Sequence, residues 1–260
     1  IVTFGKWIVG MGPFGALIYG FFNRLLIPTG LHHALNNVFW FDTAGINDIG
    51  KFQSGKDAVK GITGRYQAGF FPVMMFGIPA AALAMYHTAK SSQKKQVYAW
   101  FLASSISAFF VGVTEPIEFA FMFVAPVLFI IHAALTGLSL FIAAIFHWTA
   151  GFSFSAGLID FVLSLVNPVS NKPWMLLVQG IIFFILYYTI FRFVIQVFNL
   201  STIGRGDNEL ADPTANATSE NNSATYSESK GKYYHTASQI LDGLGGSDNI
   251  SSLTNCATRL

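Results

Sequence analysis

The sequence predicts an all-α integral membrane protein, followed by a flexible linker and the beginning of a soluble domain. Three observations support this fold class. Of the 260 residues, 53% are hydrophobic and 11% are charged, whereas ordinary soluble domains contain about 25% charged residues. Apolar segments long enough to cross a bilayer follow one another as far as residue 200. Beyond that point Ser, Asn, Thr, Ala and Gly dominate the composition.

This composition excludes a soluble enzyme for most of the chain. The net charge of +2 comes from 15 basic and 13 acidic residues without a basic patch, so we expect no nucleic-acid partner. The single cysteine, Cys256, cannot form an internal disulfide or a thiolate cluster. No HExxH or comparable spacing is present, so we also expect no metal and no cofactor.

Six segments are candidate membrane spans: residues 7–31, 69–89, 97–113, 119–135, 138–166 and 174–198. The segment 69–89 contains Pro72, Gly77 and Pro79, and the segment 138–166 contains Gly151 and Asp160. We therefore expect both of these segments to be broken or re-entrant rather than continuous helices. Broken segments at membrane depth persist where protein or a wet cavity satisfies their backbone groups, which is typical of transporters.

Basic residues give the expected orientation. Lys90, Lys94 and Lys95 follow the second apolar segment, and Arg192 and Arg205 lie at the end of the last one. The positive-inside rule places these sites, and the polar tail, in the cytoplasm.

The tail divides into two parts. Residues 201–232 contain almost no large aliphatic side chains and predict a flexible linker. Residues 233–260 regain apolar positions at Ile240, Leu241 and Leu244, and we interpret them as the truncated beginning of a soluble domain. Because the sequence opens on Ile1 inside an apolar stretch, we interpret it as an internal piece of a longer protein.

Residues 96–171 contain no Lys or Arg and only three acids, Glu115, Glu118 and Asp160. A carboxylate at the bilayer centre costs about 2.5 to 3.5 kcal/mol by insertion scales, and such groups are usually functional or paired. Glu115, in GVTEPIEF, is the best candidate to bind solute hydroxyls or to accept a proton. The alternative is that Glu115 caps a helix that begins near Ile117.

A second group of candidates lies in NRLLIPTGLHHALNN. Arg24 offers a planar fork suited to phosphate or carboxylate, and His32, His33 and Asn36 follow it. Two adjacent imidazoles do not share one helical face, so we expect at most one of them to point into a given site. The alternative for Arg24 is an interfacial side chain that snorkels to the headgroups.

Two lone histidines on apolar runs, His87 and His132, are expected to be packing residues rather than ligands. In NISSLTNCATRL, Arg259 lies close enough in sequence to lower the pKa of the Cys256 thiol, and Thr258 adds a donor that can hold an anion on sulfur. A surface thiol without a task is the alternative.

Four motifs, in order along the chain, are NRLLIPTGLHH, GFFPVMMFGIPAAALAMYHTAK, GVTEPIEFAFMFVAPVLF and LGGSDNISSLTNCATRL. Together they resemble the membrane component of the bacterial phosphoenolpyruvate-dependent sugar phosphotransferase system, glucose superfamily, fused to its phosphocysteine domain. The runs GLHHALNNVFWF and HWTAGFSFSAGLIDF resemble the N-acetylglucosamine-specific members more than the glucose-specific ones.

The resemblance implies a transporter in the bacterial inner membrane that phosphorylates the 6-hydroxyl of its sugar during entry. Residues 1–200 would form mainly the transport half of the permease, and residues 233–260 the start of a cytoplasmic α/β domain. The partners implied are a sugar, the lipid bilayer, a cytoplasmic IIA-type phosphocarrier protein and a second copy of the chain.

The resemblance also implies roles for single residues. Glu115, Thr114 and His32 would contact the sugar, and Arg24 would contact both the sugar and the incoming phosphoryl group. Cys256 would carry that group, stabilised by Thr258 and Arg259, and Glu115 or His32 would take the hydroxyl proton. For N-acetylglucosamine, Asn36 would bind the acetamido group, and Phe152 or Phe154 would line its methyl.

Three alternatives remain open from the sequence. The first is a glucose-specific member of the same system. The second is a proton-coupled secondary transporter without phosphorylation, in which Glu115, Glu118 and Asp160 would be the proton sites. The third is a channel or structural subunit, which would leave the acids without a solute to bind.

Overall fold

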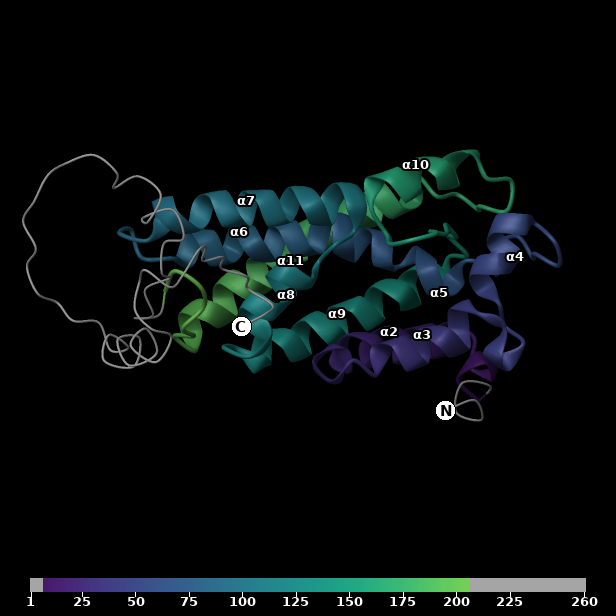
Figure 1. The fold of residues 1–260 in the computed structure, drawn as a ribbon, viewed down its shortest axis with the longest axis horizontal. Coiled ribbons are helices and arrows are strands. Elements are labelled where there is room, and N and C mark those ends of the chain that lie inside the picture. Colours follow the sequence, from purple (N-terminus) through teal and green to yellow (C-terminus); the bar gives the residue numbers. More distant parts are fainter. Residues whose placement is uncertain (1–6, 206–260) are drawn as a thin grey trace, which may run out of the picture. The chain divides into compact units, whose positions relative to one another are not determined.

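The computed structural model describes residues 7–205 (Figure 1). Its elements are α2 (Pro13–Leu25), η1 (Ile27–Thr29), α3 (His32–Trp40), η2 (Asp42–Ala44), α4 (Asp48–Ser54), α5 (Arg65–Ala68), η3 (Pro72–Gly77), α6 (Ile78–Thr88), α7 (Lys94–Val111), α8 (Glu115–Met122), α9 (Pro126–Ile145), α10 (Leu158–Val166) and α11 (Met175–Val197). In this part of the chain no strand forms, and one isolated bridge pairs Thr149 with Asn171. The predicted helical membrane fold is confirmed, whereas most of the linker and the soluble domain, with Cys256, Thr258 and Arg259, lie outside the described residues.

Within residues 7–205, three helices are long and apolar enough to cross a membrane: Arg65–Thr88, Pro126–Ile145 and Met175–Val197. The last corresponds to the predicted span 174–198. The predicted segment 97–113 is helical as α7. The predicted span 7–31 is interrupted at Gly12, whose φ of 59° lies in the left-handed region, and α2 begins directly afterwards with Pro13.

Segment 69–89 is irregular, as predicted, but it is not re-entrant. The stretch Arg65–Thr88 is long enough to cross a membrane, although a turn at Gly69 follows α5 and Pro72 opens a π-helical stretch, η3, that runs to Gly77. A π-helical turn shifts the backbone pairing to i→i+5, which accommodates a proline that lacks an N–H. Pro79 then lies in the first turn of α6, where a proline is tolerated.

The predicted boundaries between 119 and 166 also required correction. The helix α8 ends at Met122, and α9 runs uninterrupted from Pro126 through Gly137 to Ile145. A Cβ added at Gly137 would lie 2.7 Å from the Leu17 carbonyl oxygen, so this glycine permits close packing of α9 on α2 rather than ending a helix. An irregular segment does follow α9, as expected for 138–166, and α10 completes it.

Two hydrophobic clusters hold these helices together. In one, α11 packs on η3 and α6, where a Cβ at Gly77 would meet the Tyr187 ring at 2.9 Å. In the other, α2 packs along α9, and a Cβ at Gly20 would lie 3.1 Å from the Gly137 Cα. Figure 1 shows α6, α7 and α11 side by side, with α9, α2 and α3 forming a second group.

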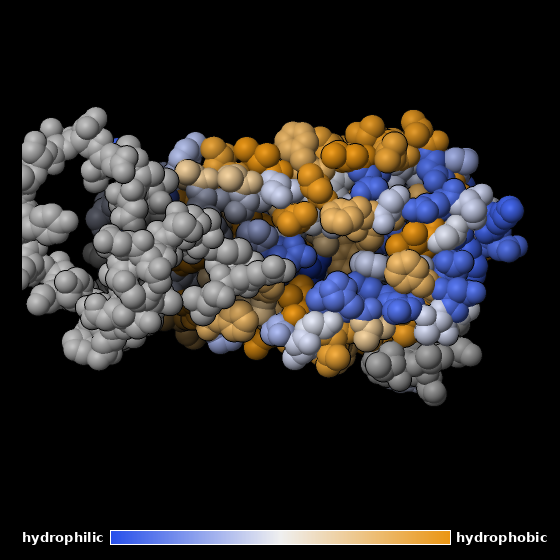
Figure 2. Space-filling model, viewed as in Figure 1, coloured by the Kyte–Doolittle hydropathy of each residue, from blue (hydrophilic) through white to orange (hydrophobic). Residues whose placement is uncertain are grey.

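The outer surface is apolar where lipid would contact it. Large side chains on α7, α9, α10 and α11 are exposed, among them Ile106, Ile130, Val166 and Ile185. Figure 2 shows apolar surface over α7 and α10, and hydrophilic surface at the end of the molecule where α4 lies. Exposed apolar surface of this extent is expected of a helical membrane protein.

The basic residues used for orientation gather at one end of the helices. The Lys90 amide donates to the Gly204 carbonyl oxygen, and Arg205 Nη1 donates to the Thr88 carbonyl oxygen. The other end also carries lysines, including Lys51 in α4. The difference in charge between the two ends is therefore smaller than the sequence argument assumed.

Candidate functional site

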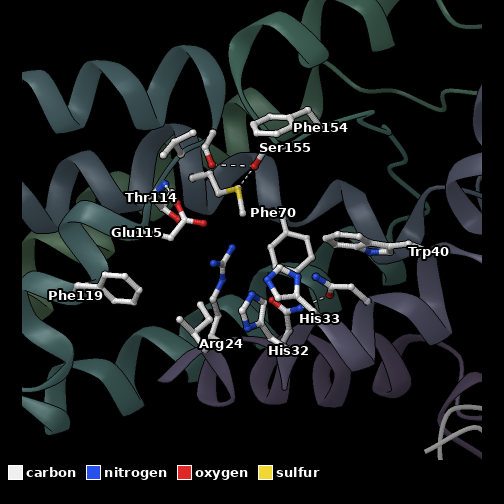
Figure 3. A pocket seen from close by; sticks show the side chains of 16 residues that line it. Arg24, His32, His33, Trp40, Phe70, Thr114, Glu115, Phe119, Phe154 and Ser155 are labelled. Atoms are coloured by element: carbon white, nitrogen blue, oxygen red, sulfur yellow. Dashed lines mark hydrogen bonds between the residues drawn. The ribbon is translucent and has the colours of Figure 1, made fainter. Parts of the chain in front are cut away.

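A cavity of about 370 Å³ opens between α2, α3 and the segment that joins α7 to α8 (Figure 3). Its wall combines charged, amide, imidazole and aromatic side chains. The lining residues are Asn23, Arg24, Ile27, His32, His33, Asn36, Trp40, Phe70, Met74, Gly112, Val113, Thr114, Glu115, Phe119, Phe154 and Ser155. The structure thus brings together five of the predicted site residues from two distant stretches of sequence: Arg24, His32, Asn36, Thr114 and Glu115.

Local backbone structure explains this convergence. Arg24 lies in the last turn of α2, and the short helix η1 ends at Gly30, whose φ of 72° lets the chain turn back into α3. On the opposite wall, Gly112 ends α7 with φ 79°. A Cβ there would meet Ser155 Oγ at 2.7 Å, and Ser155 Oγ donates to the Gly112 carbonyl oxygen at 2.8 Å.

Arg24 is buried, with 4% of its surface exposed. Its Nη1 donates to Glu118 Oε1 at 3.0 Å, and its Cζ lies 5.0 Å from the centre of the Phe70 ring. The alternative that Arg24 snorkels to the headgroups is therefore wrong. Figure 3 shows its guanidinium projecting into the ring of labelled side chains, near Glu115 and His32.

Glu118 has no exposed surface. Besides Arg24, its Oε1 accepts a hydrogen bond from Thr114 Oγ1 at 3.1 Å and lies 3.1 Å from His132 Nε2. His132 Nδ1 in turn lies 2.9 Å from the Tyr187 hydroxyl. His132 is buried, as expected of a packing residue, but it also makes a polar contact with Glu118 that the sequence did not predict.

Glu115 differs from Glu118 in its surroundings. It is exposed at the cavity, and its Oε2 accepts a hydrogen bond from the Thr114 amide at 3.1 Å. The helix α8 begins at Glu115 itself, so the carboxylate also lies at the helix N-terminus, where negative charge is favourable. The position of Glu115 is therefore compatible both with a role at the start of the helix and with binding a ligand in the cavity.

Both histidines line the cavity, with ring centres 3.9 Å apart. The prediction that at most one would point there was wrong, because the two rings lie against each other, tilted by 38°, at the beginning of α3. His32 lies outside the three candidate spans, and burial, together with neighbouring His33 and Arg24, lowers its pKa. A neutral imidazole at this position can accept a proton.

Asn36 is fixed from behind the cavity. Its Oδ1 accepts hydrogen bonds from the Tyr19 hydroxyl at 2.8 Å and from Asn23 Nδ2. The remaining polar group, the Nδ2 amide, is a donor. Asn36 can therefore present N–H groups to a ligand, but its carbonyl oxygen is already used.

Several buried polar atoms around this cavity have no hydrogen-bond partner among the described residues 7–205. They are Arg24 Nε and Nη2, His32 Nδ1, Trp40 Nε1 and, on the partner of Arg24, Glu118 Oε2. Buried polar atoms are normally satisfied, so a cluster of exceptions requires an explanation. A polar ligand in the cavity would supply one.

Trp40 was missed as a site residue by the sequence reasoning. It lies within the run GLHHALNNVFWF, between two phenylalanines, and nothing in this run distinguishes it from an aromatic residue of the core. Of the two predicted apolar walls, Phe154 lines the cavity, whereas Phe152 is buried against Trp40 and Phe70 and does not line it.

Asp160 lies away from this cavity. Its Oδ1 accepts a hydrogen bond from the Ser153 amide at 3.0 Å, within a smaller hollow that also includes Gln53 and Ser164. Among residues 7–205 no group of three His, Cys, Asp or Glu residues is placed to hold a metal ion.

Comparison with known proteins identifies the chain's family. The model of the family "Phosphotransferase system, EIIC" matches residues 1–137, and that of "phosphotransferase system, EIIB" matches residues 238–260. The chain belongs to the EIIC family of the phosphotransferase system. The family named from the sequence motifs is therefore confirmed, and with it an integral membrane protein.

Curated relatives cover nearly all of the chain. The N-acetylglucosamine-specific EIICBA component of Escherichia coli (strain K12) is 44% identical over 268 residues, which is 98% of this chain and 39% of that protein. The N-acetylglucosamine-specific EIICB component of Bacillus subtilis (strain 168) is 45% identical over 264 residues, 100% of this chain and 54% of that protein. The glucose-specific EIICBA component of Staphylococcus carnosus (strain TM300) is 41% identical over 253 residues, which is 94% of this chain and 35% of that protein. The chain thus spans between about a third and about half of the length of these relatives.

Proposed function

We propose that this chain is the sugar-binding part of a transporter that couples the uptake of N-acetylglucosamine to its phosphorylation on the 6-hydroxyl. The observation that carries the proposal is the group of buried, unpartnered polar atoms around one cavity, on Arg24, His32, Trp40 and Glu118. A sugar offers many hydroxyl groups that can donate and accept hydrogen bonds, so it would satisfy such a set.

The size and lining of the cavity support a small polar ligand. A volume of about 370 Å³ lies at the lower end of the range for small-molecule sites, about 300 to 1,000 Å³. Trp40, Phe119 and Phe154 supply apolar surface for the faces of a sugar ring, and the polar groups lie between them. Such a mixture fixes the orientation of the ligand as well as binding it.

Each polar group has a role in this proposal. Glu115, supported by Thr114, accepts hydrogen bonds from sugar hydroxyls. Arg24 holds phosphoryl oxygens through Nε and Nη2. His32 or Glu115 accepts the proton of the 6-hydroxyl as it attacks phosphorus.

The phosphoryl donor in this proposal is Cys256, within the residues matched by the EIIB model. The S–P bond breaks, the bond between the 6-oxygen and phosphorus forms, and the thiolate leaves with the electron pair. Thr258 and Arg259 stabilise the phosphoryl group on the cysteine, and positioning and charge neutralisation supply most of the catalysis. A cytoplasmic IIA-type phosphocarrier protein then restores the phosphocysteine, and the complete transporter is a homodimer.

Relatives named for N-acetylglucosamine at 44 to 45% identity support the choice of sugar. In this chain Asn36 Nδ2 and Trp40 Nε1 are donors available to the acetamido oxygen, and Phe154 is an apolar wall for its methyl group. Glucose is the second candidate, because glucose-specific relatives are 40 to 41% identical. The proton-coupled alternative is less well supported, because Glu118, one of its three acids, is paired with Arg24.

The experiment is uptake by the complete transporter with a panel of labelled sugars, followed by analysis of the sugar inside the cell. We expect labelled N-acetylglucosamine to arrive as its 6-phosphate. Accumulation of the free sugar would contradict the proposal and favour secondary transport.

A further inference from the structure

The ion pair between Arg24 and Glu118 lies at the sugar cavity but is closed to solvent. The two residues are 94 positions apart in sequence, on α2 and α8, and 5% and 0% of their side-chain surfaces are exposed. Thr114 and His132 also contact Glu118 Oε1, and Tyr187 contacts His132. Glu118 is therefore held in place by contacts from α9 and from the start of α8, and through His132 from α11.

The atoms used in this pair leave a particular edge of Arg24 free. Nη1 donates to Glu118, whereas Nε and Nη2 have no partner in the part of the chain that the structure describes. The N–H groups of Nε and Nη2 point in the same direction, along the edge of a guanidinium that can make two parallel hydrogen bonds to a phosphate or carboxylate. Glu118 thus compensates the charge of Arg24 without occupying the donors that a phosphoryl group would need.

This arrangement also determines the charge of the cavity. Among the described residues that line it, the Asp, Glu, Lys and Arg side chains are Arg24 and Glu115, one positive and one negative. Glu118 adds a second negative charge next to Arg24. The site therefore carries no net positive charge, although it contains an arginine.

A cavity without net positive charge has different affinities for the substrate and for the product. N-acetylglucosamine is neutral, whereas a phosphate monoester carries about −1.5 to −2 charges at pH 7. Charges within a buried site interact strongly, because the effective dielectric constant there is lower than in water. A cavity with an uncompensated arginine would retain the phosphorylated sugar after transfer.

We propose that Glu118 is the fixed counter-ion of Arg24 and that it keeps the cavity selective for the neutral sugar over its 6-phosphate, so that the product leaves. The inference rests on the proposed function, since it needs a sugar to be phosphorylated in this cavity. Glu118 is a positioning residue in this account: it acts through Arg24 and does not touch the reacting atoms.

The test is Glu118→Gln in the complete transporter, with the inhibition constant of N-acetylglucosamine 6-phosphate and the KM for the sugar measured side by side. We expect the inhibition constant to fall at least about tenfold, while the KM changes less than about threefold. Glu118→Asp, which keeps the charge, should bind the phosphate as the wild type does. Asp160→Asn is the matched control, because it converts a carboxylate to an amide away from the cavity, and it should leave the inhibition constant unchanged.

A folded Glu118→Gln protein with an unchanged inhibition constant would overturn the inference. That is the result expected if Glu118 had a merely structural role, because replacing a structural residue does not increase the affinity for the product. If Glu118→Gln does not accumulate, the double variant Arg24→Gln with Glu118→Gln decides. Restored accumulation of the double variant supports the counter-ion assignment, because both charges are then absent, and equally poor accumulation contradicts it. A wild type that binds neither the sugar nor its 6-phosphate contradicts the proposed function itself, which separates the two failures.

Discussion

Replacing Glu115 with Gln keeps the size of the side chain but removes its negative charge from the cavity. The Thr114 amide can still donate to the oxygen of the new amide, and Glu115 is exposed in the wild type. The free energy of unfolding should therefore change by no more than about 1 kcal/mol, the contribution of a negative charge at a helix N-terminus. The loss should fall on sugar binding and phosphorylation.

Its magnitude follows from the hydrogen bond that the carboxylate makes in the proposed site. A hydrogen bond to a charged group contributes about 1.5 to 3 kcal/mol, which corresponds to roughly a 10- to 150-fold decrease in kcat/KM. The assay is phosphorylation of labelled N-acetylglucosamine by membranes that contain the complete transporter, supplied with phosphoenolpyruvate and the soluble phosphocarrier proteins. Expression is measured on the same membranes, and Asp160→Asn serves as the control.

A Glu115→Gln transporter that phosphorylates the sugar within about threefold of the wild-type rate would refute this reasoning. It would leave Glu115 with the helix-capping role alone. A loss of protein from the membrane in proportion to the loss of activity would also refute it, because the effect would then be on folding.

Further predictions concern the phosphoryl donor, the buried network, the choice of sugar and a buried acid outside the spans. Cys256→Ser should abolish phosphoryl transfer but leave equilibrium sugar binding within about twofold; lost binding would contradict the separation of the two roles. Tyr187→Phe should lower the midpoint of thermal unfolding, since a buried hydrogen bond contributes about 0.5 to 1.5 kcal/mol, whereas Tyr188→Phe, at the exposed pair with His87, should not; equal shifts would argue against the network. Unlabelled N-acetylglucosamine should compete for uptake at least about tenfold better than glucose, about 1.4 kcal/mol, and equal competition would favour the glucose-specific alternative. Burial raises the pKa of Asp48, against hydrogen bonds from Gln67 and Gly64 that lower it, so the folded state binds this proton more tightly than the unfolded state does. The resulting stability is present below the ordinary carboxyl pKa and is lost as pH rises through the folded-state pKa; Asp48→Asn should remove that part of the pH dependence of thermal unfolding, and an unchanged profile would contradict it.

The family, the helical membrane fold and the broken segment after α9 were predictable from the sequence. The grouping of Arg24, His32 and Glu115 was also predictable, because they lie in the motifs on which the family resemblance was based, and the structure brings them to one cavity. Composition and local motifs carry this information directly.

The buried network was not predictable in the same way. Glu118 and Arg24 are separated by 94 residues, and His132 and Tyr187 by 55, so no local pattern relates them. Each residue stands alone on an apolar run, where a lone histidine is more often a packing residue. These four residues come into contact only because α2, α8, α9 and α11 pack together.

Helix continuity was mispredicted for a related reason. Gly137 and Pro72 act as breakers in local propensity, but tertiary packing and a π-helical turn accommodate them. Within apolar runs, small residues mark close helix contacts as well as helix ends. The sequence pattern does not separate these two cases.

The most direct test of the account is to find where the sugar binds. Besides the site cavity of about 370 Å³, the described residues form another hollow of similar volume, about 360 Å³, beside α4, which includes Asp48 and Arg65. A photoreactive N-acetylglucosamine analogue, such as a diazirine, would be crosslinked to the complete transporter and the labelled peptides identified by mass spectrometry. We predict labels within residues 23–40 and 112–119 that excess N-acetylglucosamine prevents. Labels confined to residues 45–66 and prevented by the same sugar would contradict the account.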